Sequence, residues 1–248
     1  MTESEASKQI EDLNNHKPSN AQPTSKKGKL RGRLNDSVDV QLSKTLSYIL
    51  RHGAIKEKLQ MRPDGFISLV DLLSRPTLKG FSSEDVYRVV AENEKKRFTI
   101  IEEPQPDGTC QALIRANQGH SLNVQDLQLD PVTELEKLPM VVHGTYSKFW
   151  ESIARQGLKP LKRTHIHFAA GLLGEDGVIS GMRASCDILI YLDVEKCLTD
   201  GIKFFRSANG VILTEGLSTS KSIPITYFKK VVKKSGEVLY PALNDITS

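Results

Sequence analysis

The chain has 248 residues, of which 38% are hydrophobic and 26% are charged, and its formal net charge is +4. These values are those of a globular protein that buries a core, and no apolar run approaches the roughly 20 residues of a membrane-spanning helix. The N-terminus is polar and has no hydrophobic signal segment, so we expect a cytoplasmic or nuclear protein without a membrane partner. Three widely spaced cysteines, without CxxC motifs, favour free thiols over a zinc site.

Residues 1–36 have the composition of a basic tail, rich in Ser, Asn, Pro and Lys. Such a composition favours a solvated, disordered segment. Tethering of RNA or nuclear import is the alternative role of its basic residues. The basic residues form one compact stretch, which comprises Lys26, Lys27, Lys29, Arg31 and Arg33.

Residues 37–121 show the pattern of three helices followed by a hairpin. The first helix has apolar residues at steps of four and three, and we expect Asp39 to cap it and Gly53 to end it. Serine is a favoured N-cap, so further helices are expected to begin at Ser68 and at Ser82 or Ser83.

Two strand-like runs, 98–101 and 111–116, flank a turn at Asp107-Gly108 and predict a hairpin. Three helices and a hairpin in this order are typical of a winged helix, a nucleic-acid-binding module. We therefore expect a winged-helix-like RNA lobe over residues 37–121. Residues 122–139 are acidic and poorly periodic, which is typical of a connector.

Beyond the connector the pattern changes to short strands. A strand leads into His143-Gly144-Thr145, and a helix is expected over Ser147–Gln156, closed by Gly157. We expect a β-rich lobe over residues 140–233, a C-terminal tail over 234–248, and an α+β fold for the whole chain. Further strands are expected at 165–168, 188–193, 203–205, 211–214 and 225–232.

Two basic motifs are candidates for phosphate chemistry. Arg51 and His52 stand side by side where a helix is expected to end. A guanidinium matches phosphate oxygens, and an imidazole exchanges protons near neutral pH. The helix dipole also favours basic residues in a last turn, so a purely structural role remains open. The run 114–121, Ile-Arg-Ala-Asn-Gln-Gly-His-Ser, is dense in donors and lacks acids, so it fits either an RNA backbone contact or a polar surface loop.

A third arginine and two histidines complete the set. Arg183 follows a glycine-containing loop that could close over a phosphate, although an ordinary exposed arginine fits equally well. His143 and His167 lie on neighbouring expected strands and suit hydrogen bonds to a ribose, or structural places in the core. There is no GxGxxG, no P-loop motif and no acidic pair for magnesium, so we expect phosphate chemistry to depend on arginines without a metal.

The motifs together resemble one family, the RNA (tRNA) 2'-phosphotransferases, over roughly residues 38–232. Each motif alone has modest specificity, but their joint order and intervals are highly specific. The basic tail and the insertion around residues 75–81 make the chain more similar to the animal form than to the shorter bacterial one. The matching motifs are Leu42-Ser43-Lys44, Leu50-Arg51-His52-Gly53, the run 114–121, His143-Gly144-Thr145, Gly181-Met182-Arg183 and the run 205–211, Phe-Arg-Ser-Ala-Asn-Gly-Val.

The resemblance implies that an RNA lobe joins an ADP-ribosyltransferase-like lobe, with NAD as co-substrate in the cleft between them. The splice-junction 2'-phosphate of ligated tRNA would attack NAD, giving nicotinamide and RNA-2'-phospho-ADP-ribose. The ribose 2''-hydroxyl would then release RNA with a free 2'-hydroxyl and ADP-ribose 1'',2''-cyclic phosphate. This reaction would be the last step of tRNA splicing, by a protein that we expect to be a monomer.

The resemblance also implies a role for each matching residue. Arg51, His52, Arg115 and Arg183 would be catalytic, with His52 as the acid-base group. NAD would contact His143, Gly144, Thr145, His167, Asn209 and Val211, and RNA would contact Lys44, Asn117, Gln118 and His120. Two alternatives remain open: ADP-ribosylation of terminal nucleic-acid phosphates, and a non-catalytic RNA-binding winged-helix protein.

Overall fold

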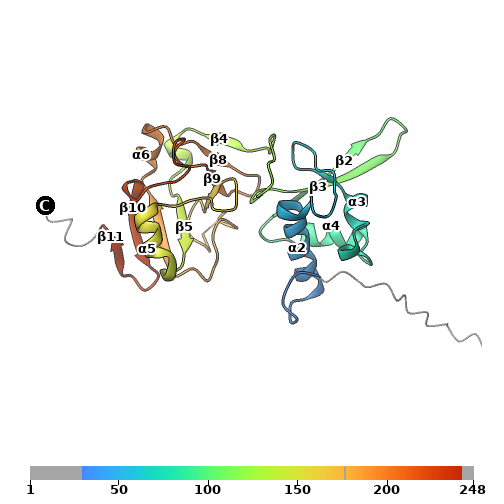
Figure 1. Cartoon of the computed structure of the whole chain (residues 1–248), viewed down its shortest axis with the longest axis horizontal. Helices are drawn as coiled ribbons and strands as arrows, with labels where there is room; N and C mark the ends of the chain where they lie inside the picture. Colours follow the sequence, from blue (N-terminus) through green and yellow to red (C-terminus); the bar gives the residue numbers. More distant parts are fainter. Residues whose placement is uncertain (1–29, 176, 242–248) are drawn as a thin grey trace, which may run out of the picture.

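A computed structural model describes residues 30–175 and 177–241. It shows an α+β protein in which the elements up to β3 lie on one side and the elements from β4 onward on the other (Figure 1). The basic residues Lys26, Lys27 and Lys29 lie outside the described residues. None of the helices within the described ranges is both long and apolar enough to cross a membrane.

The N-terminal part is built from helices packed on a three-stranded antiparallel sheet in the order β1-β3-β2. Its apolar core includes Leu42, Leu46, Val86 and Ile114, all with no exposed area. Leu30, at the start of the described chain, packs against the same core, so the expected tail is attached to the fold before residue 36. The elements are α2 (Val38–Tyr48), a π-helical turn (Ile49–Gly53), β1 (Ile67–Ser68), α3 (Leu69–Leu73), a 3-10 turn (Pro76–Leu78), α4 (Ser83–Ala91), β2 (Phe98–Pro104) and β3 (Cys110–Ala116).

Local capping chemistry explains where these helices begin. Ser68 caps α3, and Ser82 caps α4 in a reciprocal capping box with Asp85, both as expected from the sequence. The cap of α2 is Ser37, whose hydroxyl accepts the Val40 amide, so the prediction of Asp39 was wrong by two residues. A serine hydroxyl and an aspartate carboxylate are similarly good caps, and the hydrophobic pattern does not distinguish the two positions.

Gly53 does not end the helix in the expected way. It lies in the π-helical turn and has no positive φ. The first residue after it with a positive φ is Lys58, where φ is 55°. A Cβ at Gly53 would lie 2.8 Å from the Tyr48 ring, so this glycine makes room for an aromatic side chain one turn earlier. The helical stretch therefore ends at Gly53 as expected, although this glycine leaves room for a ring and does not adopt a positive φ.

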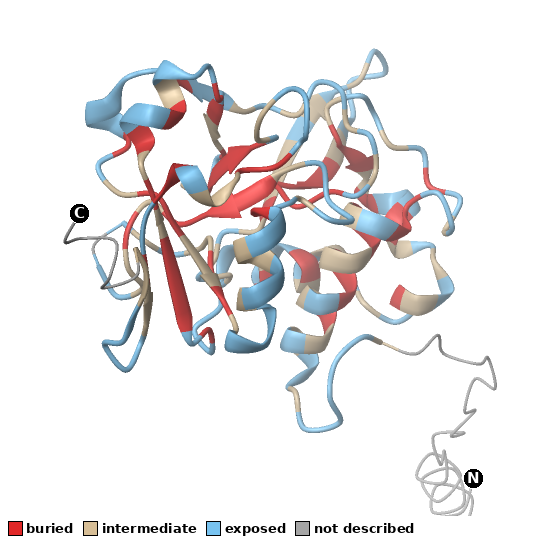
Figure 2. Cartoon of the chain, turned by 60° about the vertical axis from the view of Figure 1, so that its left-hand side comes forward, coloured by how far each residue is buried: buried red, intermediate tan, exposed pale blue. Residues whose placement is uncertain are grey.

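The C-terminal part contains two four-stranded sheets, in the orders β11-β10-β7-β5 and β4-β8-β9-β6. Its strand pairs are antiparallel, and buried residues concentrate in the strands (Figure 2). The bounds are β4 (Asp130–Val132), a 3-10 turn (Leu135–Lys137), β5 (Val142–Thr145), α5 (Ser147–Gln156), β6 (Ile166–Phe168), β7 (Ile188–Leu192), α6 (Val194–Thr199), β8 (Phe204–Arg206), β9 (Ile212–Thr214), a 3-10 turn (Ile225–Tyr227), β10 (Phe228–Lys233) and β11 (Val238–Tyr240).

Three elements of this part depart from the sequence expectations. Residues 122–139, expected to be a connector, contribute β4, which pairs with β8. Residues 234–248, expected to be a tail, contribute β11, which pairs with β10. The short helix α6 was not expected, although Asp193 caps it. Both extra strands are at sheet edges and only three residues long, so they carry little periodicity of their own.

Candidate active site

The end of the first helix is joined to the loop that follows β3. The carbonyl of Arg51 accepts the Ser121 amide at 3.0 Å, and Nδ1 of His52 lies 2.9 Å from the Ser121 hydroxyl. Gly119, in the same loop, has a φ of +88°, and a Cβ there would lie 3.4 Å from Nε of Arg51. The loop 117–121 therefore lies directly against the Arg51 guanidinium, and glycine suits that close approach.

This loop also contacts the C-terminal part. The carbonyl of His120 accepts the amide of Thr164 at 3.1 Å, just before β6. Arg163 precedes Thr164, and its charge contributes to lowering the pKa values of Arg51 and His52. The same charge acts on His143 and His167. Arg163 thus lies among groups from both parts of the chain, at a junction formed by residues 51–52, 119–121 and 163–167, which we call the basic junction.

Unpaired buried polar atoms concentrate in this region. Among the described residues, the buried side-chain nitrogen and oxygen atoms without a hydrogen-bond partner are Nε and Nη2 of Arg51, Nε of Arg115, both ring nitrogens of His120 and Nε2 of His167. All four residues were candidates from the sequence. An unpaired buried polar group costs about 1–3 kcal/mol, so such groups need an explanation, and an anionic ligand rich in acceptors satisfies guanidinium donors.

The electrostatics of the junction are those of an anion site. Burial, with smaller contributions from Arg163 and Arg97, lowers the pKa of Arg51 to about 10, so the guanidinium stays charged at neutral pH. Burial and then Arg51 lower the pKa of His120 to about 4. Burial, followed by Arg163, Arg51 and Arg31, also lowers the pKa of His52, which favours its neutral form.

Arg183 approaches the junction from the loop after β6. It is exposed, and its charge lowers the pKa of Arg163 after the larger effect of burial. Tyr146, which follows β5, lies 2.8 Å from the Ser185 hydroxyl, and Ser185 and then Arg183 lower its pKa. Gly181 has a φ of +114°, and a Cβ there would lie 2.6 Å from Cα of Ala169, so this loop can only turn tightly against β6 with glycine.

The residues at β5 have contacts that the sequence did not distinguish. Nδ1 of His143 lies 2.9 Å from the backbone carbonyl of His167, and this contact orients the His143 ring. Thr145 is buried. A Cβ at Gly144 would lie 2.8 Å from Sγ of Cys186 and 2.9 Å from Cβ of Met182, so this glycine allows the loop of Arg183 to pack on β5.

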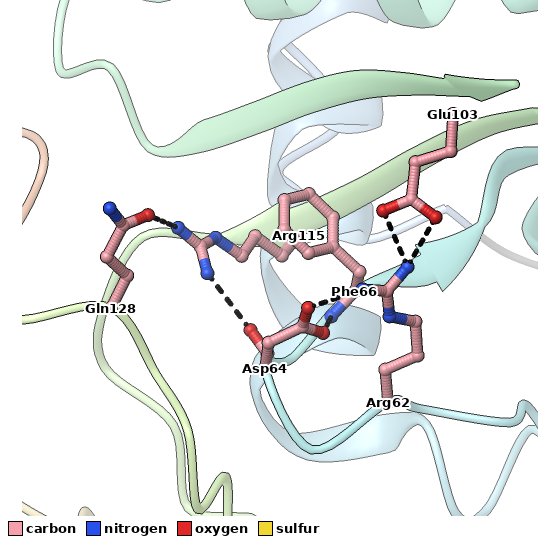
Figure 3. Close-up of polar contacts among 6 residues, drawn as sticks. All are labelled: Arg62, Asp64, Phe66, Glu103, Arg115 and Gln128. Carbon is pink, nitrogen blue, oxygen red and sulfur yellow. Dashed lines mark hydrogen bonds and ion pairs between the residues drawn. The ribbon is translucent and has the colours of Figure 1, made fainter.

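Arg115 lies among Asp64, Phe66 and Gln128 (Figure 3), and this environment differs from that of Arg51. Its Nη1 donates to the carbonyl of Asp64 at 3.1 Å, its Nη2 donates to Gln128 at 3.0 Å, and its guanidinium stacks on Phe66 at 4.6 Å. Its charge contributes to lowering the pKa of His120, which places it within electrostatic range of the junction. Two of its three guanidinium nitrogens are nevertheless bonded to neutral acceptors, and only Nε is unpaired.

Two asparagines among the candidate residues, one from each part of the chain, bind backbone carbonyls of the turn before β2. Asn117 donates its side-chain amide to the carbonyl of Lys96 at 2.8 Å. Asn209 donates to the preceding carbonyl, that of Lys95, at 2.9 Å, from a position 114 residues later. These contacts position Arg97, which follows directly and contributes to lowering the pKa of Arg51.

The remaining candidates make internal contacts. Gln118 and Val211 are buried, and the carbonyl of Val211 accepts the amide and hydroxyl of Ser207. Lys44 forms an ion pair with Asp36 at 2.6 Å. The structure thus brings Arg51, His52, His120, His143 and His167 together and does not place Lys44 or Val211 with them through any contact.

Sequence reasoning missed Arg163, and the signal for it was weak. It is a basic residue two positions before the histidines of the predicted strand 165–168, with no acidic residue nearby in the sequence. In residues 30–175 and 177–241, no salt bridge involves Arg51, Arg163 or Arg183. Three arginines without acidic partners leave their positive charge available to a ligand.

Other features of the described chain do not compete with this site. No group of three His, Cys, Asp or Glu residues with metal-binding geometry is found among the described residues. A cavity of about 620 Å³ lies at the edge of the second sheet, where Asp130, Lys137 and Arg206 are among the lining residues. The cavity contains no member of the basic junction, so we place the candidate site at the unpaired cations.

The fold and the site define an α+β protein with a cationic junction suited to phosphate groups. Residues 37–216 match the model of the RNA 2'-phosphotransferase, Tpt1/KptA family. The chain is 53% identical to tRNA 2'-phosphotransferase 1 of Danio rerio over 191 residues, which cover 75% of this chain and 84% of that protein. It is 53% identical to tRNA 2'-phosphotransferase 1 of Homo sapiens over 196 residues, covering 79% and 76%.

A fungal relative matches a similar share of the chain at lower identity. The chain is 42% identical to tRNA 2'-phosphotransferase of Saccharomyces cerevisiae over 207 residues, which cover 80% of this chain and 86% of that protein. The family match covers well over half of the chain and includes Arg51, His52, Arg115 and Arg183. The chain therefore belongs to the RNA 2'-phosphotransferase family of enzymes, as its motifs predicted.

Proposed function

We propose that this protein transfers the splice-junction 2'-phosphate of ligated tRNA to NAD at the basic junction. The observation that carries the proposal is the concentration of unpaired buried cationic and imidazole nitrogens on Arg51, His120 and His167, beside Arg163. Family membership supports the reaction class. The tRNA substrate follows the printed names of the relatives, and the NAD co-substrate follows the motif resemblance.

The donors at the junction fit a dinucleotide that carries a pyrophosphate and two riboses. Arg163 and Arg183 supply charge and have no acidic partner among residues 30–175 and 177–241. Nε2 of His167 is an unpaired ring nitrogen in the neutral form favoured by burial. His143 and Thr145 lie on the adjacent strand β5. We assign the dinucleotide to these C-terminal residues and the RNA phosphate to Arg51 and His52. In this assignment the C-terminal part acts as the ADP-ribosyltransferase-like lobe and the N-terminal part as the winged-helix-like RNA lobe.

The first step forms a bond from a 2'-phosphate oxygen to the nicotinamide-bearing ribose carbon. The bond from that carbon to nicotinamide breaks, and nicotinamide leaves with the electron pair. Because the phosphate is already anionic, this step needs positioning and no strong base.

The second step forms a bond from the ribose 2''-oxygen to the phosphorus and breaks the bond to the RNA 2'-oxygen. One proton leaves the 2''-hydroxyl and one joins the RNA oxygen, so a single acid-base group suffices. His52 is the exposed imidazole of the junction, and its lowered pKa favours the neutral form that accepts a proton at pH 7. Arg51 is placed to stabilise the charge that develops on the phosphoryl oxygens.

The test is product analysis with the full chain, NAD and a short RNA that carries one internal 2'-phosphate. We expect equal amounts of nicotinamide, 2'-hydroxyl RNA and ADP-ribose 1'',2''-cyclic phosphate. RNA binding without nicotinamide release would contradict the proposal and favour a non-catalytic RNA-binding protein.

Two further arms sharpen this test. A 5'-phosphorylated strand should give at most an ADP-ribosylated end, because it lacks the geometry for phosphate release. EDTA should leave the rate unchanged, because the proposed charge stabilisation comes from arginines. A rate that falls with the chelator and returns with added metal would contradict that account.

A further inference from the structure

The first described residues pack against α2 and the N-terminal core. The backbone amide of Arg31 donates to the hydroxyl of Thr45 at 2.9 Å, and Thr45 is buried. Leu30 packs against the N-terminal core. Two consecutive residues of the basic segment are therefore attached to the fold, although composition alone predicted a solvated tail.

This attachment places the Arg31 side chain on an aromatic ring. Its guanidinium lies over Tyr48, with Cζ 3.1 Å from the ring centroid. Stacking on an aromatic face holds the planar group in place and leaves its edge free to donate hydrogen bonds. Arg31 is exposed, and no salt bridge within the described chain involves it.

Tyr48 connects Arg31 to the candidate site. The ring centroids of Tyr48 and His52 are 6.2 Å apart, one helical turn along the same face. Gly53 provides the space for the Tyr48 ring, as described above. The charge of Arg31 is also the smallest of the contributions that lower the pKa of His52.

We propose that Arg31, held on Tyr48, binds a backbone phosphate of the RNA strand next to the nucleotide whose 2'-phosphate reaches His52. This inference rests on the proposed function, because it extends the RNA-binding surface of the same site. A stacked guanidinium with a free edge is the arrangement that recognises a phosphate. The ring on which it stacks lies one helical turn from His52, which makes the flanking strand the partner within reach. The contact would be to backbone and would carry no sequence preference.

Arg33 provides a matched control. It carries the same charge two residues later and is equally exposed, but its backbone amide bonds to Asp36 and no aromatic ring lies under its side chain. Binding of the full chain to 2'-phosphorylated RNA is measured by fluorescence anisotropy without NAD, at several salt concentrations. The variants are Arg31→Ala, Arg31→Lys and Arg33→Ala, each checked by thermal unfolding.

We expect Arg31→Ala to weaken binding about tenfold and Arg33→Ala by less than about twofold, because only Arg31 is preorganised. The salt slope of Arg31→Ala should fall by about 0.7, the value for one phosphate of a single strand. Arg31→Lys should be intermediate, because it keeps the charge and loses the planar fork. Equal effects of Arg31→Ala and Arg33→Ala would overturn the proposal.

Substrate length gives a second readout. A minimal 2'-phosphorylated nucleotide without flanking phosphates should bind equally to wild type and to Arg31→Ala. A tenfold loss on this minimal ligand would overturn the flanking contact and place Arg31 on the reacting phosphate. If wild type binds RNA but releases no nicotinamide, the proposed function fails while the comparison of Arg31 with Arg33 still decides this inference.

Discussion

Arg51 and Arg115 both lie close to the loop 117–121, Arg51 against Gly119 and Arg115 in β3 just before the loop, but their surroundings differ. Nε and Nη2 of Arg51 are buried without partners, and its charged neighbours, Arg163 and Arg97, repel it. Arg115 is 5% exposed and donates to the carbonyl of Asp64 and to Gln128 while it stacks on Phe66. The motif pattern assigned the two the same role.

The difference separates a binding group from a group that also supports the fold. A buried cation without partners lowers the stability of the free protein and gains most when an anion arrives. An arginine bonded to neutral acceptors stabilises its surroundings as well as offering its remaining N–H donors to a ligand. Substitution of Arg51 should therefore affect activity, and substitution of Arg115 should affect stability as well.

The largest expected effect is that of Arg51→Ala on the second step. Losing a preorganised donor should slow that step by about 10²–10³-fold, so RNA-2'-phospho-ADP-ribose should accumulate. The free energy of unfolding should stay the same or rise, because the substitution removes buried donors that have no partner. Gel analysis of the RNA with urea unfolding measures both quantities. Full turnover by the variant would show that Arg51 has no part in phosphate release.

Acidification should destabilise the protein through His120. The unfolded imidazole has a pKa of 6.5 and the folded one a pKa of about 4, so between these values the unfolded state binds the proton and the folded state does not. Stability is therefore lost as the pH falls from 6.5 to 4, by about 3 kcal/mol for this residue. Urea unfolding at pH 7.5 and 4.5 should show a smaller acid loss in His120→Gln than in wild type; equal losses would refute the assignment.

Arg115→Met should lower the free energy of unfolding by about 2 kcal/mol, since it leaves two acceptors unpaired and removes the stack on Phe66. Arg62→Met is the matched control. Arg62 pairs with Asp64 and Glu103 beside the same ring, but its side chain is 42% exposed, so its loss should cost less than about 1 kcal/mol. Equal costs in urea unfolding would contradict the distinction between the two sites.

The smallest expected effect is that of Arg163→Ala, at about tenfold in kcat/KM. The same variant should move the acid limb of the pH–rate profile to higher pH, because Arg163 is the main charge that lowers the pKa of His52. Arg163→Lys keeps that charge and should keep the limb in place. Arg155→Ala, an exposed arginine of α5, controls for net charge. An unmoved limb in Arg163→Ala would show that His52 is not the titrating group.

The parts of the fold that local chemistry determines could be predicted from the sequence. Ser68, Ser82 and Gly157 mark helix boundaries through short-range hydrogen bonds and a positive φ, and the structure has them where expected. The edge strands β4 and β11 could not be predicted, because three-residue strands depend on their partners β8 and β10.

In the candidate site, too, residues within local motifs could be predicted, and residues that depend on distant partners could not. The motifs identified Arg51 and His52, whose neighbours in the chain already indicate phosphate chemistry. They did not identify Arg163, whose role depends on groups from residues 51–52 and 143, far away in the sequence. The contact of Asn209 with Lys95 spans 114 residues and equally leaves no local pattern.

The central claim, that the RNA 2'-phosphate binds among the cations of the basic junction, is tested most directly by the pKa values of His52 and His120. NMR titration of the two imidazoles, assigned with His52→Gln and His120→Gln, measures both with and without RNA. A 2'-phosphorylated RNA should raise both pKa values, because its negative charge opposes Arg51 and Arg163, and the same RNA with a 2'-hydroxyl should raise them less. Unchanged values, or equal changes with both RNAs, would contradict the account.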